Sequence, residues 1–595
     1  MQPSEHFMIT WDGLKLFYRA WRPPTPSDKA VILFHRGHEH SGRFQEVVDN
    51  LALEDVSIFA WDARGHGRSP GERGYADNFS CLVKDANSFV GFISKEYKIP
   101  MKNIVVMAHS VGSVVASTWV HDYAPPIRAM VLATPALRVK LYVPFAIPFL
   151  RVWQAIQPKA FIQSYVKAKM LTHDPEQAKQ YRDDPLITRA IAVNILIDLD
   201  DTSTRIIADA GAIQVPTLLL AAGSDWVVRL SAQQRFFDRL SSPVKQMHVY
   251  PGFYHDIFHE KDRHLPIAKA REFILDVFTR PPDQRPLILA DREGYTRTEY
   301  DYLSKPLPIA SSRRFYFAGL KMLMKMVGTL SHGIRIGWRT GFDSGESLDY
   351  VYENKAKGAT PLGKMLDKCY LNTIGWKGIR ERKSNLEKVL QATIEKVHVT
   401  EKPVRVVDIA SGPGRYLLVT VKKMSHVEIS VLLRDRDPQG LEVARKLARA
   451  WNLSNVTYTQ GDAFDFASLA SISPRPHIAI VSGLYELFAD NTKVLNSLRG
   501  LWEALQDGGY LIYTNQPWHP QVEMIARVLI NRDGQPWVMR RRTQAEMDDL
   551  VRVAGFEKMH MEIDMYGIFT VSVARRKETS HKTQIVSHAS IEHNR

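Results

Sequence analysis

The sequence predicts an α/β protein with two separate sheets. Short runs rich in Val, Ile and Leu recur along the chain, and each is followed by a turn with Gly, Ser or Asp and then by a helical pattern. Residues 280–286 read Arg-Pro-Pro-Asp-Gln-Arg-Pro, a proline-rich and charged break between two such series. A chain of 595 residues is too long to fold around a single hydrophobic core, so we expect two domains joined near this break.

The composition is typical of a folded protein from a reducing compartment. Hydrophobic residues make up 45% of the chain, and its two cysteines, Cys81 and Cys369, cannot build a disulfide framework. The N-terminus shows no signal peptide pattern, and the apolar run 141–150 is half as long as a membrane span. We therefore expect a cytoplasmic protein, either soluble or peripheral on the inner face of the membrane. The net charge of +14 suits nucleic acid, anionic lipid or simply solubility.

The stretch 104–116 predicts a strand, a sharp turn and a helix. It reads Ile-Val-Val-Met-Ala-His-Ser-Val-Gly-Ser-Val-Val-Ala, with Ser110 at the tip of the turn. Such a turn holds the serine hydroxyl above the carboxyl edge of the sheet, and the helix N-terminus behind it favours developing negative charge. Ser110 is therefore the candidate nucleophile.

Two backbone N–H groups are expected to form an oxyanion hole beside this serine. In acyl-transfer enzymes the loop after an earlier strand supplies one, and the residue after the nucleophile supplies the other. Gly37 and Val111 occupy those places. The first loop also carries three histidines, His35, His38 and His40. No matching cluster of ligands stands elsewhere in the sequence, so we expect no metal site.

Two further catalytic candidates follow Ser110 in chain order, each just past a predicted strand. Asp225 follows the apolar run 215–222, and His255 follows the short strand 247–250. The order Ser, Asp, His suits a triad in which His255 takes the serine proton and Asp225 fixes the histidine tautomer. Water then releases the acyl-enzyme. The sequence thus predicts a serine hydrolase.

Three motifs carry a resemblance to a known family. They are His-Arg-Gly-His-Glu-His-Ser-Gly-Arg-Phe at 35–44, Asp-Ala-Arg-Gly-His-Gly-Arg-Ser at 62–69 and Ala-His-Ser-Val-Gly at 108–112. They resemble the monoacylglycerol lipase and lysophospholipase branch of the α/β-hydrolases, although Arg36 and Ala108 each replace a glycine of the family pattern. The resemblance implies an α/β-hydrolase fold with a helical cap, here at about 136–205, and a monoacylglycerol or lysophospholipid as substrate.

Two segments combine cations with apolar side chains and contain no acid. One is 136–173, within the expected cap, and the other is 311–340, after the proline-rich break. An apolar and basic lid would shelter an acyl chain and suit an anionic lipid surface. Packing on the core explains the first segment equally well, and docking between the domains explains the second. The sequence leaves these alternatives open.

The second chemical centre lies at the ends of three predicted strands, 404–407, 427–433 and 456–459. The first is followed by the turn Asp-Ile-Ala-Ser-Gly-Pro-Gly-Arg, whose glycines let the backbone approach a nucleotide-like ligand closely. An acid near the end of the second is placed to accept both ribose hydroxyls. The candidate ligand-binding residues at these ends are Asp408, Gly412, Gly414, Asp435, Asp462 and Ala463.

This alternation resembles the class I S-adenosylmethionine-dependent methyltransferases over about residues 345–577. The resemblance implies a Rossmann-like fold and S-adenosylmethionine as cofactor, with Asp408, Gly412 and Gly414 around its methionine part. It also implies Asp435 at the ribose and Asp462 with Ala463 at the adenine. NAD is the competing ligand, but the turn lacks the spacing Gly-x-Gly-x-x-Gly and has its acid at the strand end, which favours S-adenosylmethionine.

The methyl acceptor is expected beside the loop after the fourth strand. The candidates are Tyr485 and Glu486, with Trp376 and Arg380 from the preceding helix. A motif such as Asn-Gln-Pro-Trp, found here at 515–518, indicates methylation of nucleic-acid bases when it follows the fourth strand of the sheet. In this sequence it follows the fifth predicted strand. We therefore expect no nucleic-acid partner.

The sequence thus predicts a bifunctional enzyme, a lipase-like serine ester hydrolase joined to a methyltransferase that acts on lipid. The alternative is a hydrolase of small esters or peptides whose C-terminal half binds S-adenosylmethionine without turnover. The whole layout resembles bacterial fusion proteins without an assigned reaction. The expected parts are a hydrolase at 1–280, a basic amphipathic linker at 281–344, a methyltransferase at 345–577 and a disordered tail at 578–595. The sequence predicts neither the acyl chain, the acceptor nor the oligomeric state.

Overall fold

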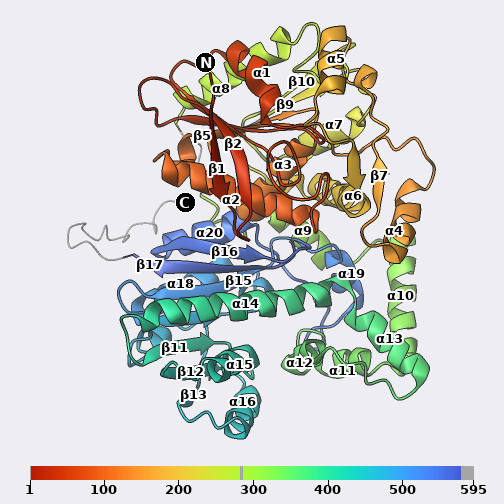
Figure 1. Ribbon diagram of the computed structural model, residues 1–595. Coiled ribbons are helices and arrows are strands. Elements are labelled where there is room, and N and C mark those ends of the chain that lie inside the picture. The colour runs from red at the N-terminus through yellow and green to blue at the C-terminus, as the bar shows by residue number, and fades with distance from the viewer. Residues whose placement is uncertain (1, 282–285, 578–595) are drawn as a thin grey trace, which may run out of the picture.

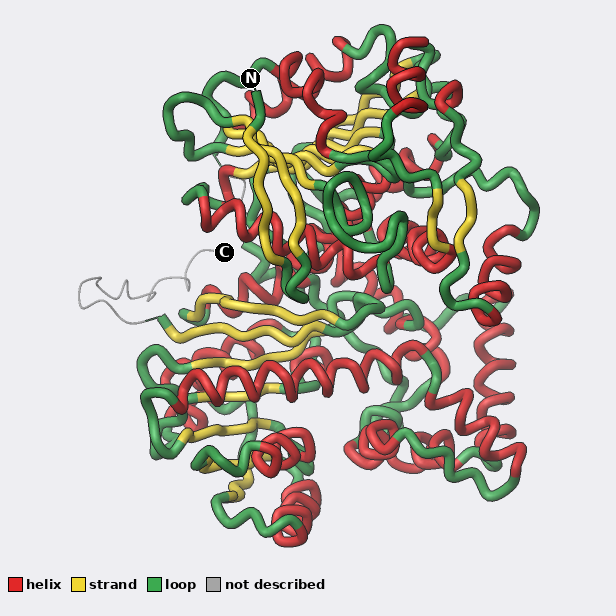
Figure 2. Tube along the Cα trace, viewed as in Figure 1, coloured by secondary structure: helices red, strands yellow, loops and turns green. Residues whose placement is uncertain are grey.

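The computed structural model describes residues 2–281 and 286–577. Each half of the chain contains its own sheet with helices on both faces, which is the two-sheet α/β architecture predicted from the sequence. The N-terminal half lies at the top of Figure 1 and the C-terminal half lies below it. In Figure 2 the strands of the C-terminal sheet run beneath the helices of the N-terminal half. The tail predicted at 578–595 lies outside the described residues.

The N-terminal sheet has eight strands in the order β1-β2-β4-β3-β5-β6-β9-β10. β2 is antiparallel to both of its neighbours, and all the other pairs are parallel. The strands are β1 Ser4–Ile9, β2 Lys15–Trp21, β3 Ala30–Phe34, β4 Ser57–Trp61, β5 Ile104–His109, β6 Ala129–Ala133, β9 Thr217–Ala222 and β10 Lys245–Tyr250. Strands β3 to β6 and β9 are buried along their whole length, which explains their continuous apolar sequences.

Helices cover both faces of this sheet and form two apolar layers. One layer contains α2 (Phe79–Glu96), α3 (Val111–Tyr123) and α7 (Leu230–Arg239). The other contains α1 (Gln45–Leu51) and α8 (His264–Thr279). The sheet is therefore sandwiched, and its functional groups emerge only at the strand ends.

The cap lies between β6 and β9, where the sequence predicts an interruption of the alternation. Its elements are α4 Ala146–Ile156, β7 Phe161–Gln163, α5 Pro175–Asp183, β8 Ala190–Ala192 and α6 Val193–Ala208. The carboxylate of Asp174 accepts the N–H groups of Glu176 and Gln177, so it caps α5 at the point where Pro175 begins the helix. β7 and β8 pair into a small antiparallel sheet.

The C-terminal sheet has seven strands in the order β13-β12-β11-β14-β15-β17-β16. The first five are parallel, and β17 is antiparallel to both of its neighbours. The strands are β11 Val404–Ile409, β12 Ile429–Asp435, β13 Val456–Gln460, β14 Ile478–Val481, β15 Tyr510–Asn515, β16 Phe556–Ile563 and β17 Thr570–Arg576. This is a doubly wound arrangement in which neighbouring loops gather at the carboxyl edge.

Two helical layers also cover the C-terminal sheet. The long helix α14 (Ile374–His398), which crosses the front of Figure 1, packs with α15 (Arg415–Lys423) and α16 (Pro438–Ala450). The other face carries α17 (Phe466–Ala470), α18 (Asn491–Ala504) and α20 (Gln544–Val553).

Residues 286–344, within the segment that the sequence predicts as an amphipathic linker, are largely helical and contact both halves of the chain. They fold into α9 (Tyr295–Ser304), α10 (Ser312–Gly328) and α11 (His332–Thr340). One side of α10 packs through Phe317, Leu320 and Met324 on a cluster that also holds α11, α12 (Gly345–Glu353), α13 (Pro361–Leu371) and α19 (Val522–Val528). The sequence shows that this helix is amphipathic but not which surface its apolar side meets.

The two halves are in direct contact. Met561 of β16 belongs to the core cluster of the N-terminal half, and Nζ of Lys84 on α2 lies 2.6 Å from Oε2 of Glu562. Helix α20 packs against α3. Within the described part of the chain, no helix combines the length and the apolar character needed to cross a membrane.

Candidate active sites

Ser110 occupies a strained turn between β5 and α3. Its φ of 54° and ψ of −112° lie in a region that L residues rarely adopt, which is the conformation expected of a nucleophile elbow. Gly112 makes the turn possible because a Cβ at that position would lie only 2.5 Å from the backbone oxygen of His35. Ala108, which replaces the first glycine of the family motif, sits in β5 opposite Phe34 and leaves the turn intact.

The structure brings together the three residues predicted for the triad. Nε2 of His255 lies 2.8 Å from Oγ of Ser110, and Nδ1 lies 2.8 Å from Oδ2 of Asp225. The residues follow β5, β9 and β10, three strands whose carboxyl ends lie at the same edge of the sheet. All three side chains are buried. The arrangement suits proton transfer from Ser110 to His255.

The environment of Asp225 keeps its carboxylate ionised. Burial by itself raises the pKa of Asp225, but the neighbouring His255 and two backbone hydrogen bonds outweigh burial and lower the pKa overall. The two donors are the N–H groups of Val227 and Val228, at 2.7 and 2.9 Å from Oδ1. An ionised Asp225 stabilises the imidazolium that forms when His255 takes the serine proton.

The predicted oxyanion residues lie side by side. A Cβ placed on Gly37 would lie 3.1 Å from Cγ2 of Val111, so the two backbone segments face each other. Val111 is the first residue of α3, and its N–H therefore has no acceptor within the helix. His35 holds the loop that carries Gly37, since Nδ1 lies 2.7 Å from the oxygen of Arg36 and Nε2 accepts the N–H of Ala63 at 3.0 Å.

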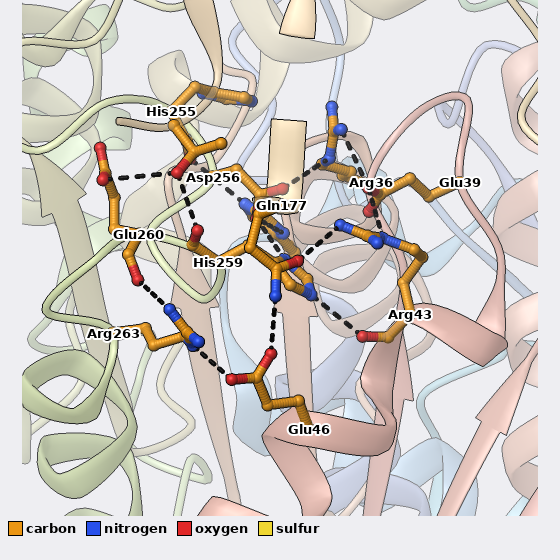
Figure 3. A network of polar contacts seen from close by, with 12 residues as sticks. Arg36, Glu39, Arg43, Glu46, Gln177, His255, Asp256, His259, Glu260 and Arg263 are labelled. Carbon is orange, nitrogen blue, oxygen red and sulfur yellow. Dashed lines mark hydrogen bonds and ion pairs between the residues drawn. The ribbon is translucent and has the colours of Figure 1, made fainter. Parts of the chain in front are cut away.

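Arg36, which replaces a glycine of the family pattern directly before Gly37, does not enter the oxyanion hole. Its side chain is buried against Glu39, at 2.9 Å, and Asp256, at 3.6 Å, and its guanidinium lies over the ring of Tyr181. Figure 3 shows this group within a larger network. Burial raises the pKa of Asp256, but His259 and Arg36 outweigh burial and hold the pKa well below its usual range.

The same network ties the cap to the loop that carries His255. Nε2 of Gln177, on the cap helix α5, donates to Glu46 at 2.8 Å, while a nitrogen of Arg43 donates to the amide oxygen of Gln177 at 3.2 Å (Figure 3). Glu260 accepts the N–H of Tyr254 at 2.9 Å, directly before His255. These supporting residues are not predicted by the sequence motifs. Only their places beside the motifs, such as Asp256 after His255, could have indicated them.

The three histidines of the first loop have separate partners. Nε2 of His40 contacts Asp184 at 2.9 Å, and burial lowers the pKa of His38 to about 4. Within residues 2–281 and 286–577, no group of three or more His, Cys, Asp or Glu side chains is placed to hold a metal ion.

In the C-terminal half, the structure joins the loops that were predicted to bind a cofactor. Oδ2 of Asp435 accepts the N–H of Gly412 at 2.7 Å. Gly412 and Gly414 have φ angles of 51° and 56°, where glycine is favoured. A Cβ on Gly412 would meet no atom within 4 Å, so the loop borders open space, whereas one on Gly414 would lie 2.9 Å from Cδ2 of Leu433.

The other predicted cofactor residues stand at the same sheet edge. Asp408 is fully buried, and its Oδ2 accepts a hydrogen bond from the hydroxyl of Tyr416 at 2.6 Å. Burial raises the pKa of Asp408 to about 8. Asp462 is exposed and accepts the N–H of Phe464 at 2.9 Å. Ala463 is buried. The strands that position these residues, β11, β12 and β13, are neighbours in the sheet.

The predicted acceptor residues are only partly brought together. Glu486 and Trp376 line one cavity of about 110 Å³, but Tyr485 and Arg380 do not belong to its lining. Tyr485 is a core residue, since its ring packs among buried side chains and its hydroxyl lies 3.0 Å from Oγ of Ser497. The side chain of Tyr485, predicted as a substrate residue, therefore does not reach this cavity. The two neighbours diverge because the turn Tyr485–Leu487 sends successive side chains in different directions.

Comparisons with known proteins match both halves. A family model described as "Serine aminopeptidase, S33" matches residues 25–262, and one described as "Putative methyltransferase" matches residues 270–576. The chain is 48% identical to "Uncharacterized protein YnbC" of Escherichia coli strain K12, over 97% of this chain and 99% of that protein.

Two further relatives match the N-terminal half. A monoacylglycerol lipase of Mycolicibacterium smegmatis is 27% identical over 46% of this chain and 97% of the lipase. The crystal structure of Paleococcus ferrophilus monoacylglycerol lipase is 24% identical with a TM-score of 0.41, and it covers 44% of this chain and 99% of that one.

These matches confirm the predicted fold class of each half and the predicted resemblances. The N-terminal half is a monoglyceride lipase-like α/β-hydrolase domain. The chain as a whole belongs to the family described as "Putative methyltransferase", whose model covers more than half of its length.

Proposed function

We propose that the N-terminal half is a serine carboxylic ester hydrolase that acts on a monoacylglycerol or a lysophospholipid. The observation that carries this proposal is the position of His255 between Ser110 and Asp225, at 2.8 Å from each. Relatives named as monoacylglycerol lipases support the substrate class.

The geometry supports a two-step reaction. Oγ of Ser110 attacks the ester carbonyl carbon while its proton passes to Nε2 of His255, and the N–H groups of Gly37 and Val111 stabilise the oxyanion. The alcohol takes that proton as its C–O bond breaks, which leaves an acyl-enzyme. Water then attacks the acyl carbon and gives a proton to His255, which passes it to Oγ of Ser110 as the bond between Oγ and the acyl carbon breaks and the acid is released.

We also propose that the C-terminal half uses S-adenosylmethionine, which supplies an activated methyl group when it is bound. The open space at Gly412 and the link between Gly412 and Asp435 fit such a ligand. Asp408, Gly412 and Gly414 would surround its methionine part, Asp435 its ribose and Asp462 with Ala463 its adenine. Lipid is the proposed class of acceptor, because the other half of the chain is lipase-like.

A peripheral contact with an anionic membrane would bring both halves to such substrates. On α4, Phe149 and Ile156 are 67% and 78% exposed, and Phe145, directly before the helix, is 83% exposed. On α10 the exposed side chains include Phe315 and Met326. Both helices appear at the right-hand rim of the molecule in Figure 1. An apolar surface of this kind favours insertion at the level of the lipid headgroups.

The cations of the cap contribute less to this contact than the sequence suggests. Arg138 pairs with Asp200 at 2.6 Å, and Arg151 pairs with Asp201 at 2.6 Å. Because these charges have partners within the chain, we expect the apolar side chains to dominate binding.

A second candidate is hydrolysis of small esters or peptides, with a C-terminal half that binds S-adenosylmethionine without turnover. The description of the N-terminal family model as a serine aminopeptidase favours it. It predicts activity on short soluble substrates and none on long acyl chains.

One experiment separates these candidates. Wild type and Ser110→Ala are incubated with monoacylglycerols, lysophospholipids, a short soluble ester and an amino-acid amide, and the products are read by mass spectrometry. Release of long-chain acid by wild type alone supports the lipid proposal, whereas activity confined to the short substrates refutes it. Ser88→Ala is the matched control, since Ser88 lies on α2 and its hydroxyl donates only to the oxygen of Lys84.

The methyltransferase and membrane proposals have separate tests. Calorimetry measures binding of S-adenosylmethionine, and labelled methyl groups are then sought in a lipid extract. Sedimentation with phosphatidylglycerol vesicles tests the membrane contact for wild type, Phe149→Ser and the control Val399→Ser, a residue that is 82% exposed at the end of α14. Loss of binding in Phe149→Ser alone supports the contact, and equal binding of all three refutes it.

A further inference from the structure

The cavity beside Glu486 combines an apolar wall with a few polar groups. Its volume is about 110 Å³, and its apolar lining includes Trp376 and Ile379 on α14 and Phe569 before β17. Trp376 and Ile379 are three residues apart and therefore share one face of the helix. All three side chains are at least nine-tenths buried. This combination of an apolar body and few polar groups is typical of a binding site for a small molecule.

Five polar atoms in the lining have no hydrogen-bond partner among the described residues. They are Oε2 of Glu486, Oδ1 of Asp343, Nε2 of Gln516, Nε1 of Trp537 and the hydroxyl oxygen of Tyr370. Glu486 and Gln516 are 5% and 4% exposed, so bulk water does not readily compensate for the missing partners. Buried polar groups without partners are costly. Two carboxylate oxygens accept, two nitrogens donate and the Tyr370 hydroxyl can do either, which matches a ligand with a hydroxyl group, since a hydroxyl both donates and accepts.

Arg382 fixes which oxygen of Glu486 remains available. One nitrogen of Arg382 donates to Oε1 of Glu486 at 3.1 Å, and its guanidinium lies over the ring of Phe569. Oε2 is left without a partner. Arg382 therefore acts as a positioning residue that presents one carboxylate oxygen to the cavity.

His519 cannot serve as a base at the same cavity. Its Nδ1 accepts the N–H of Gln521 at 3.0 Å, and burial lowers the pKa of the ring to about 4. A neutral ring that accepts at Nδ1 carries its proton on Nε2, so it is a donor. Asp343 also lines the cavity. Oδ2 of its carboxylate lies 3.5 Å from Nε of Arg532, whereas Oδ1 has no partner, so Asp343 is the rival acceptor that the test must separate from Glu486.

The cavity lies next to the loop proposed for the cofactor. Ile409 of β11 is paired with Val481 of β14, so the loops that follow these strands leave the sheet side by side. Gly412 belongs to the first loop, and Gly483 in the second lines the cavity. An acceptor bound here would therefore approach the methyl group from the neighbouring loop.

We propose that this cavity binds the methyl acceptor through a small hydroxyl-bearing ring, with Oε2 of Glu486 accepting the hydroxyl proton. The inference rests on the proposed methyltransferase function. An apolar cavity of about 150 Å³ accommodates benzene, so this one, at about 110 Å³, admits at most a single small ring or a chain end. On transfer, the acceptor oxygen bonds to the methyl carbon as that carbon's bond to sulfur breaks. The sulfur keeps the electron pair, and the hydroxyl proton passes to Glu486.

The test compares phenol with benzene, which differ only in the hydroxyl group. Calorimetry at pH 8 without any cofactor measures the binding of both to wild type, Glu486→Gln, Asp343→Asn and the surface control Glu557→Gln. We expect wild type, Asp343→Asn and Glu557→Gln to bind phenol about tenfold more tightly than benzene, because a hydrogen bond to a charged group is worth about one order of magnitude. Glu486→Gln should lose this preference.

Three results would overturn the inference: equal binding of phenol and benzene to wild type, an unchanged preference in Glu486→Gln, or its loss in Asp343→Asn. If Glu486→Gln does not fold, Leu529→Trp provides the second test, since Leu529 lines the cavity and a larger side chain should abolish binding of both compounds.

A separate titration with S-adenosylmethionine distinguishes failure of the proposed acceptor cavity from failure of the proposed methyltransferase function. Cofactor binding without a phenol preference overturns this inference alone. A phenol preference without cofactor binding leaves the binding site in place but removes its role as an acceptor site, together with the proposed methyltransferase function.

Discussion

Arg541 and Asp209 form a buried, bidentate ion pair that joins the two halves of the chain. Nη1 of Arg541 lies 2.8 Å from Oδ2 of Asp209, and Nη2 lies 2.6 Å from Oδ1. Nε2 of His121 contacts the same Oδ2 at 2.6 Å, and His121 lies on α3, which begins directly after Ser110. A short run of buried contacts thus connects the helix behind the nucleophile with the C-terminal half.

Replacing Arg541 by alanine should destabilise the whole protein. The change leaves the buried charge of Asp209 without its main partner, and such a loss costs about 3–5 kcal/mol. Arg151→Ala is the matched control, because Arg151 and its partner Asp201 are 47% and 55% exposed and the pair contributes less than about 1 kcal/mol. Denaturant unfolding measures both variants, and similar losses in the two would contradict the assignment of Arg541.

Asp225→Asn should reduce the hydrolase rate without unfolding the domain. An amide in place of the carboxylate cannot hold His255 in the required tautomer, and the known consequence for such triads is a loss of about 10⁴ in kcat. Ester hydrolysis kinetics and a thermal melt measure the two effects. Asp238→Asn, on the exposed side of α7, serves as the control and should keep full activity. A reduction of less than tenfold in Asp225→Asn would exclude the proposed role.

Two helical glycines should respond in opposite ways to replacement by alanine. Gly112→Ala forces a Cβ to within 2.5 Å of the backbone oxygen of His35, so β3 and α3 must separate and the protein should lose stability and activity together. Gly91→Ala on α2 adds a Cβ that meets no atom within 4 Å and should gain about 0.5–1 kcal/mol. Thermal melts compare the variants. A fully active and stable Gly112→Ala would show that the elbow is less tightly packed than described.

Asp408→Asn should change how stability depends on pH. Burial raises the pKa of Asp408 from 3.8 to about 8, so between these values the folded state holds a proton that the unfolded chain has released. Stability linked to this group therefore decreases as pH rises from about 4 to 8. Asparagine does not ionise, and the variant should lose less Tm than wild type between pH 6 and pH 8. The exposed Asp462→Asn is the control, and a wild-type slope in both variants would contradict the prediction.

The sequence was sufficient for the triad because strong local rules act on those residues. A serine in a strained strand-to-helix turn, followed in order by Asp225 and His255 after apolar strands, leaves few alternative arrangements. The sequence predicts the first and last residues of a strand less precisely than it predicts the strand itself. The apolar run from Val215 predicts a strand that in fact begins at Thr217, because Pro216 has no N–H to donate to the ladder.

The predicted acceptor site shows that local sequence patterns do not predict which residues meet in the folded protein. The sequence places Tyr485 and Glu486 together, but the structure buries the first in the core and turns the second toward a cavity. Gln516 and Trp537, which line the same cavity, lie on separate loops. Gln516 belongs to the Asn-Gln-Pro-Trp motif, which does not indicate this cavity, and Trp537 belongs to no motif. Their proximity depends on contacts between segments far apart in the chain, and no local pattern records these contacts.

By itself, the sequence determined the two α/β sheets, the order of the catalytic groups and the glycine turns, because strand periodicity and backbone constraints act over a few neighbouring residues. Only the tertiary structure decided that Arg36 pairs with Asp256, that α10 packs on the C-terminal half and that Arg541 meets Asp209. Each of these outcomes depends on which surfaces are buried against each other, and burial decides whether a charge or an apolar face finds a partner.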